Sequence, residues 1–278
     1  MSTTRSELDL ALKTLWGAKS WPGAAESALI VAHPQWSSAM RSLDQLLAVQ
    51  GSGLVHGGYG VGKSYLLHRW GERLSPKQVR LIRLCHSSLM GSDLIRQLVK
   101  LGGRPPVLRR GDNVLTLAEL WREWAPAWPV VAVEEAQDLS VSALEELRLL
   151  LCARNDAKPP FSLILCGDLS LLPKLDLGVH QALLSRLGFC VRLDRWAPDS
   201  LRDYLNGRLA EAGVNVSPLD AQAETLLIQS AQGSPRTLGA LLQRTLEQAA
   251  LAQRRNVLAA DVQAALDNLP WIARPRPD

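Results

Sequence analysis

Residues 53–68 read GLVHGGYGVGKSYLLH, a short apolar strand followed by a glycine-rich turn and a helical pattern. Gly57 to Ser64 fit the pattern G-x-x-x-x-G-K-[ST]. In such a loop the glycines let backbone N–H groups turn toward a phosphate chain, and the helix that follows adds the positive end of its dipole. The flanking strand and helix argue against an incidental glycine turn. The sequence therefore predicts a nucleoside triphosphate site.

The loop residues have separate expected roles. We expect the Lys63 ammonium to reach the β- and γ-phosphates of ATP, and the Ser64 hydroxyl to ligate Mg²⁺. The residues predicted to hold the nucleotide are Gly57, Gly58, Tyr59, Gly60, Val61, Gly62, Lys63 and Ser64.

Two carboxylates follow the apolar run VVAV, in VVAVEEAQDL. A site that hydrolyses a nucleotide needs a carboxylate near the metal and a group that orients water. We expect Glu135 to polarise the water, and Glu134 to act on the metal through its bound water. The alternative is that both residues only end the strand. The position of the pair at a strand end in a chain with a phosphate loop favours the catalytic interpretation.

The chain alternates short apolar strands with helical or loop-like sequence from Gly53 onwards. This alternation predicts a parallel α/β sheet with strands in GLVHG, QVRLIRLC, PVVAVEE, SLILCGD and FCVRLDRW. After Ala197-Pro198 only helical patterns follow. We therefore predict an N-terminal helix and linker over 1–34, an α/β nucleotide-binding domain over 35–197, a helical lid domain over 198–269 and a flexible tail over 270–278.

The composition of the chain limits the kinds of partner and site that we expect. Lys and Arg total 31 against 27 Asp and Glu, a net charge of +4 that is compatible with a polyanionic partner. The four cysteines stand singly, so neither a disulfide framework nor a zinc site is expected. Neither a signal peptide nor an apolar run of the roughly 20 residues that a membrane helix needs is present in the sequence. We expect a cytoplasmic protein with no membrane partner.

Several motifs together resemble AAA+ ATPases of the ExeA/TniB/MuB/TnsC branch. They are the phosphate loop, VVAVEEAQDL, the strand segment SLILCGDLSLL, the Leu-Ser-Arg-Leu segment at 184–187, and Gly233-Ser-Pro-Arg236. The similarity covers roughly residues 35–267 in order, and the combination is more specific than any one motif. The branch includes a type II secretion ATPase and the target-selecting ATPases of transposons.

The resemblance implies an AAA+ sheet of five parallel strands in the order 5-1-4-3-2, with a small helical lid. It also implies that Arg186 is a finger that reaches the nucleotide of a neighbouring subunit, and that Arg236 is a sensor on the lid. Taken singly, either arginine could be an ordinary surface charge. Two residues depart from the branch: Glu134 replaces its usual Asp, and Asp168 stands at the first sensor position, where a carboxylate repels a γ-phosphate unless protonated, turned away or shielded. We therefore expect slow hydrolysis.

Secretion members of the branch join the ATPase to a membrane anchor, and the chain ends soon after the lid. We therefore expect a member of the transposon type, which forms ATP-dependent oligomers, as a ring or a helical filament, on duplex DNA and presents them to a transposase. The residues predicted to contact DNA phosphates without sequence preference are Lys100, Arg104, Arg109 and Arg110. A solvated basic loop is the alternative for this segment. The alternative function is an ExeA-like ATPase of type II secretion or envelope assembly that acts on protein partners.

Overall fold

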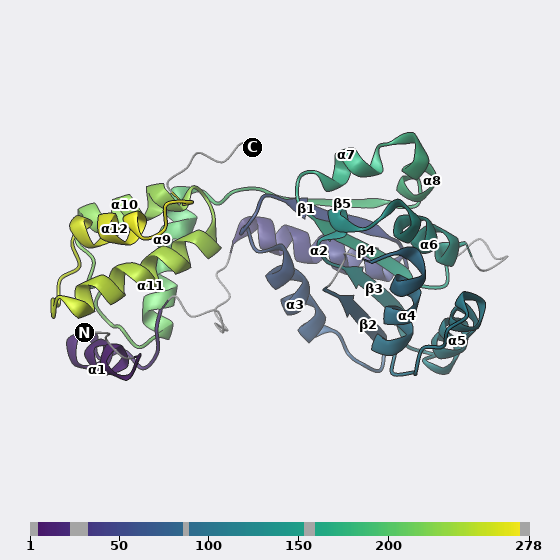
Figure 1. Ribbon diagram of the computed structural model, residues 1–278, viewed down its shortest axis with the longest axis horizontal. Helices are drawn as coiled ribbons and strands as arrows, with labels where there is room; N and C mark the ends of the chain where they lie inside the picture. The colour runs from purple at the N-terminus through teal and green to yellow at the C-terminus, as the bar shows by residue number, and fades with distance from the viewer. Residues whose placement is uncertain (1–4, 23–32, 86–88, 153–158, 273–278) are drawn as a thin grey trace. The chain divides into compact units, whose positions relative to one another are not determined.

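The computed structural model describes residues 5–22, 33–85, 89–152 and 159–272, and the chain divides into two compact units (Figure 1). The sheet unit comprises Pro34–Gly58 and Lys63–Leu193. The helical unit comprises Met1–His33, the loop segment Tyr59–Gly62 and the residues from Asp194 onwards.

The sheet unit is built on five parallel strands in the order β2-β3-β4-β1-β5. The strands are β1 (Gly53–Gly57), β2 (Val79–Leu84), β3 (Trp128–Val133), β4 (Ser162–Gly167) and β5 (Phe189–Leu193). Counted from the other edge this order is 5-1-4-3-2, so the expected sheet is confirmed. The phosphate loop follows β1, which lies between β4 and β5.

The burial of each strand follows from its place in the sheet. β3 and β4 are central, and their apolar runs VVAV and LIL are fully buried. A parallel strand that is covered on both faces has this continuous apolar pattern. β2 is an edge strand, so it tolerates polar side chains, among them exposed Arg80 and half-buried Arg83. From β2 the Arg83 side chain reaches the carboxylate of Glu134, which directly follows β3.

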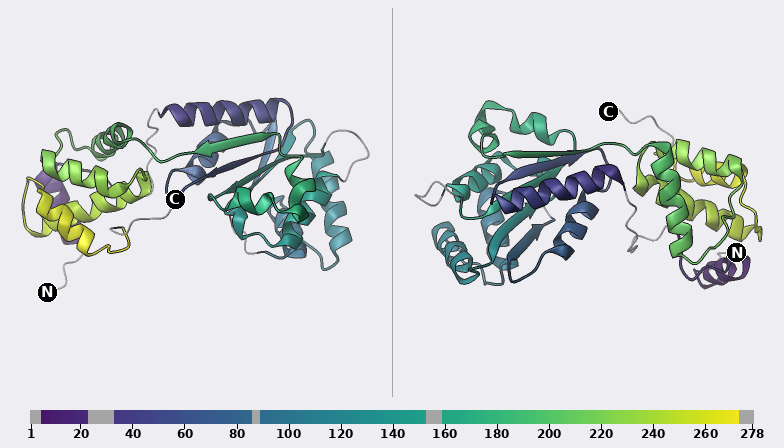
Figure 2. Two further views of the ribbon diagram at one scale, coloured as in Figure 1. Left: turned by 90° about the horizontal axis from the view of Figure 1, so that it is seen from above. Right: turned by 180° about the vertical axis from the view of Figure 1, so that it is seen from behind.

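Helices cover both faces of the sheet. Figure 2 shows α2 on one side of the sheet and the helices around α6 on the other. Leu94 and Leu98 of α4 and Leu144 and Leu147 of α6 are fully buried in one core with the strands, and each contributes roughly 1.5–3 kcal/mol. The helices are α2 (Pro34–Ala48), α3 (Lys63–Arg73), α4 (Gly91–Leu101), α5 (Arg110–Glu123), α6 (Val141–Leu151), α7 (Leu171–Leu175) and α8 (Gln181–Leu184), with short 3-10 turns η1 (Ala136–Asp138) and η2 (Gly178–His180).

The helical unit packs around α11, which contacts each of the other four helices. Ser234 caps α11 by accepting a hydrogen bond from the backbone N–H of Thr237 at 3.2 Å, and Pro235 occupies the first turn, where a missing N–H costs nothing. The helices are α1 (Arg5–Trp16), α9 (Pro198–Glu211), α10 (Ala221–Ala231), α11 (Pro235–Leu251) and α12 (Ala259–Asp267). The expected helical C-terminal region is confirmed, and the domain boundaries given above stay predictions.

The N-terminal helix α1 packs on α11. Leu12 is buried there, and the Trp16 indole N–H donates to the carbonyl of Arg255 at 2.7 Å. Residues 23–32 of the expected linker and 273–278 of the expected tail lie outside the described residues. Among the helices that the structure describes, none has the length and apolar character needed to cross a bilayer.

Candidate nucleotide-binding site

The phosphate loop runs from the end of β1 at Gly57 to the start of α3 at Lys63. Gly60 and Gly62 have φ angles of 74° and 102°, which side chains strongly disfavour. A Cβ atom at Gly60 would also lie 2.3 Å from the Ser234 hydroxyl oxygen within the helical unit. The glycines therefore allow a backbone turn that other residues would block.

Lys63 is the first residue of α3 and is buried. Its ammonium donates to the carbonyl oxygens of Gly57 and Gly58, each at 2.9 Å. A buried charge is costly unless it has such partners. The contacts give the Lys63 ammonium hydrogen-bond partners at the start of α3, the helix end where anions bind most readily.

Glu134 lies directly after β3 and hydrogen-bonds with Ser64 and with Arg83 of β2. Cys85 also donates to the carboxylate, at 3.4 Å. Burial acts to raise the pKa of the Glu134 carboxyl, but the hydrogen bonds from Ser64 and Arg83 and the Arg83 charge outweigh it, so the pKa lies below its ordinary value. Glu134 is therefore an ionised, buried carboxylate.

The oxygens of Ser64 and Glu134 fit a magnesium ion. Mg²⁺ prefers oxygen ligands and retains several waters beside a carboxylate and phosphates. The structure brings these two predicted residues together, and it adds a guanidinium on the same carboxylate. Arg83 therefore neutralises part of the charge that the carboxylate offers to a cation.

Glu135 has the backbone angles φ 48° and ψ 42°, in the left-handed region, where it begins the short turn η1. Such a conformation is uncommon for residues other than glycine. The Glu135 carboxylate accepts a hydrogen bond from the side-chain amide of Gln137 at 2.8 Å. The predicted water-polarising group is thus held by a neighbour on its own turn.

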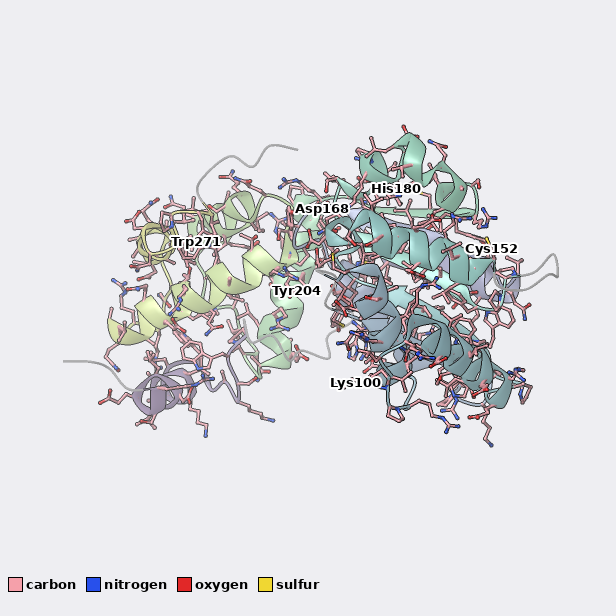
Figure 3. All side chains as sticks on the ribbon, turned by 45° about the vertical axis from the view of Figure 1, so that its right-hand side comes forward. Lys100, Cys152, Asp168, His180, Tyr204 and Trp271 are labelled. Atoms are coloured by element: carbon pink, nitrogen blue, oxygen red, sulfur yellow. The ribbon has the colours of Figure 1, made fainter. Side chains whose placement is uncertain are left out.

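Asp168 lies at the end of β4 and is buried, and Figure 3 labels it. Its Oδ1 accepts from the backbone N–H of Ser170 at 2.9 Å and from the Ser170 hydroxyl at 2.5 Å. Asp168 therefore caps its own loop, a common use of this residue type in turns. This gives the carboxylate at the sensor position partners on its own loop.

The four charges around β4 act together on Cys166. The pKa of the Cys166 thiol is raised to about 12: burial is the largest cause, Glu134 and Glu135 also raise it, and Lys63 and Arg83 lower it. The phosphate-loop lysine, both strand-end glutamates and the β2 arginine therefore all lie near enough to act electrostatically on one residue of β4.

The two predicted arginines belong to different units, Arg186 to the sheet unit and Arg236 to the helical unit. Arg186 is exposed between α8 and β5, and its guanidinium donates to the carbonyl of Ala182 on its own segment. Arg236 is exposed in the first turn of α11, and its backbone N–H approaches the Gly60 carbonyl at 3.4 Å. The side chain of Arg186 has the exposure that a contact with another subunit requires.

The predicted DNA-contacting residues divide into two pairs. Arg104 donates to both carboxylate oxygens of Glu123 at 2.7 Å, and Arg110 forms an ion pair with Glu146. The side chains of Lys100 and Arg109 make no ion pair with any residue that the structure describes. Lys100 lies in the last turn of α4, and Figure 3 labels it. Lys100 and Arg109 are therefore fully available to bind phosphates, whereas Arg104 and Arg110 already have carboxylate partners.

Sequence reasoning gave no role to Arg83 or Gln137. Arg83 interrupts the apolar pattern of VRLIRL close to the C-terminal end of its strand, where parallel sheets carry their sites, and this was a usable signal. Gln137 stands two residues after Glu135 in EEAQ, but its side-chain contacts depend on how β4 packs beside β3. The spacing of residues along the sequence does not predict that packing.

Residues 47–175 match the family model described as an AAA domain. Among solved structures, the chain is similar to the Aeropyrum pernix ORC1 protein in complex with DNA, with a TM-score of 0.69, 18% identity and coverage of 90% of this chain and 69% of that one. It is also similar to Cdc6p from Pyrobaculum aerophilum, with a TM-score of 0.72, 17% identity and coverage of 89% and 70%.

A third similar structure is the RuvB Holliday junction branch migration motor of Thermotoga maritima, with a TM-score of 0.59, 15% identity and coverage of 90% and 74%. Among curated proteins, no sequence match was found. The sheet order, the phosphate loop and these similarities show an AAA+ fold with an α/β sheet and a helical C-terminal region.

Proposed function

We propose that this chain is an AAA+ ATPase that binds ATP with Mg²⁺ and hydrolyses it. The observation that carries the proposal is the Lys63 ammonium, buried and held by two loop carbonyls at the start of α3. That arrangement presents a positive charge at the N-terminal end of a helix, where backbone N–H groups have no partner within the helix. A phosphate chain is the ligand that uses both.

Ser64 at the start of α3 and the two glutamates after β3 then divide the chemical work. Ser64 and Glu134 would hold the metal, and bound Mg²⁺ would neutralise charge on the phosphate oxygens. Glu135 orients and polarises the attacking water. Asp168 is engaged by Ser170, which supports a role in shaping the loop after β4. Arg236 acts as the sensor of the helical region.

We further propose that the protein works as a homo-oligomer on duplex DNA. The exposure of Arg186 supports its action on the nucleotide of an adjacent subunit. The available charges of Lys100 and Arg109 support binding to the DNA backbone without sequence preference. Similar solved structures include one described as bound to DNA and one described as a branch migration motor.

The finer proposal is the regulation of DNA transposition, through target-site selection and recruitment or activation of a transposase in the cytoplasm. The motif series from the phosphate loop to Arg236 supports this class. The competing function is an ExeA-like ATPase that acts on protein partners in secretion or envelope assembly. DNA binding separates the two classes.

The test combines nucleotide and DNA binding. The purified protein is titrated with labelled duplex DNA in the presence of an ATP analogue, ADP or no nucleotide. We expect binding to DNA of any sequence that strengthens with the ATP analogue. No binding at low salt would favour the protein-directed alternative, whereas failure to bind ATP would contradict the ATPase proposal itself. Inspection of the neighbouring genes for a transposase tests the finer proposal.

A further inference from the structure

The side-chain amide of Gln137 bridges two parts of the sheet unit. Its nitrogen donates to the Glu135 carboxylate at 2.8 Å, and its oxygen accepts the backbone N–H of Asp168 at 3.2 Å. The opposite amide orientation would set oxygen against carboxylate and N–H against N–H, so both partners select the same orientation. The bridge joins the turn after β3 to the end of β4.

The neighbours of Gln137 fix this position. A Cβ atom on Gly167 would lie 2.6 Å from the Gln137 amide oxygen, so the side chain lies against bare backbone of β4. On the other side, the Lys174 ammonium donates to the carbonyls of Gln137 and Leu139, each at 2.6 Å. Main chain and side chain of Gln137 are therefore both held in place.

Glu135, whose carboxylate accepts the hydrogen bond from Gln137, is the proposed catalytic group and needs accurate positioning. Glu135 has a long side chain and a left-handed backbone at φ 48°, so its carboxylate is not oriented by a regular helix or strand. A misplacement of about 1 Å of a reacting group can lower a rate about a hundredfold. A hydrogen bond from a fixed donor prevents such misplacement.

We infer that Gln137 is a positioning residue for ATP hydrolysis, which orients the Glu135 carboxylate and couples it to the end of β4. The inference rests on the proposed ATPase function. It assigns Gln137 no contact with ATP, so it concerns the rate of the chemical step and leaves nucleotide affinity unchanged. Movement of the β4 end would then change the orientation of Glu135.

Two substitutions separate the two ends of the bridge. Gln137→Met keeps the length of the side chain and removes both hydrogen bonds. Gln137→Glu keeps an oxygen for the Asp168 N–H but replaces the donor by a carboxylate that repels Glu135. We expect either variant to lower the single-turnover hydrolysis rate about tenfold or more, while the affinity for an ATP analogue changes less than about twofold. Gln181→Met is the matched control, because the Gln181 amide also donates to a carboxylate, that of Asp176, at 3.2 Å.

A double-mutant cycle tests whether Gln137 acts through Glu135. In a Glu135→Ala background, Gln137→Met should lower the remaining rate no further, because the group that it positions is gone. A wild-type rate in Gln137→Glu, an equal loss of ATP affinity and rate, or additive losses in the cycle would each overturn the inference. A wild-type protein that binds ATP but never hydrolyses it would overturn it as well. Wild type that does not bind ATP would instead remove the proposed function.

Discussion

The guanidinium of Arg83 donates two hydrogen bonds to the Glu134 carboxylate, one of them from Nε at 3.2 Å. The two residues meet because β2 and β3 are parallel neighbours, and the Glu134 N–H donates to the carbonyl of Leu84 at 2.8 Å. The carboxylate beside the expected metal site thus already has a cationic partner within the protein. The Arg83–Glu134 ion pair therefore affects the stability of the fold as well as the charge beside the expected metal site.

Arg83→Met should make the protein less stable and change how its stability depends on pH. The folded-state pKa of Glu134 lies below its ordinary value of 4.5, so its contribution to the free energy of unfolding is complete above that pH and is lost as pH falls through the folded pKa. Without Arg83, only the hydrogen bonds from Ser64 and Cys85 oppose the raising of the pKa by burial. We expect a loss of roughly 2 kcal/mol at pH 7 that shrinks toward acid pH. Denaturant unfolding across a pH series measures it.

Arg80→Met provides the control, because Arg80 is exposed on the same strand. It should change the free energy of unfolding little at any pH. A loss of equal size in both variants would show that the strand, and not the ion pair, is responsible.

Lys63→Ala should abolish ATP binding or nearly so, because the phosphate chain loses its buried cationic partner. Isothermal titration with ATP and Mg²⁺ measures the affinity. Lys100→Ala removes an exposed lysine and should leave that affinity unchanged. Unaltered binding by Lys63→Ala would contradict the assignment of the loop.

Glu135→Gln should keep ATP binding and lose turnover, because the amide cannot polarise water as a carboxylate does. Arg186→Ala should also lose turnover, by about a thousandfold if it is a finger supplied in trans. Mixing the two inactive proteins should restore part of the activity, since some interfaces then pair intact Arg186 with intact Glu135. A rate independent of protein concentration, with no recovery on mixing, would indicate that each subunit works alone.

The double substitution of Lys100 and Arg109 by Ala should weaken binding to all duplex DNA sequences alike. Each phosphate contact on B-DNA contributes roughly −0.9 to the slope of log affinity against log salt, so two lost contacts reduce its magnitude by about 1.8. A salt series with the ATP analogue measures the slope. Replacing Arg104 and Arg110, which are engaged by Glu123 and Glu146, should reduce it less. An equal effect of both double substitutions would show that those ion pairs open on DNA.

The sheet was predictable because its determinants are local. Each strand is a short apolar run, and the phosphate loop marks the first of them. The order of the strands required more, since periodicity says nothing of which strands are neighbours; it came from the resemblance carried by several motifs in sequence. The helix α5 shows the limit: the sequence around Arg109 and Arg110 is equally compatible with a solvated basic loop, whereas Arg110 is the first residue of a helix.

The positions of candidate site residues were predictable where a motif fixes the geometry and not where tertiary packing does. Lys63 and Ser64 are adjacent at the start of α3, so their placement follows from the spacing of the motif, and their roles stay predictions. The pairs Arg83–Glu134 and Arg110–Glu146 join residues far apart in sequence, on elements whose contact is set by the core. Because the sequence does not show that Glu146 pairs with Arg110, it does not indicate how available Arg110 is to DNA phosphates.

The Lys63 ammonium sets a selectivity threshold for ligands. Because the Gly57 and Gly58 carbonyls already accept its hydrogen bonds, a ligand binds by exchanging those neutral oxygens for its own. Oxygens of a triphosphate carry more negative charge than a carbonyl and make stronger bonds, whereas a weakly basic anion such as chloride gains little from the exchange. The affinity for a nucleotide then depends on the difference between the hydrogen-bond energies of Lys63 with the phosphate oxygens and with the loop carbonyls. The backbone of the loop thus competes with the nucleotide for one cation.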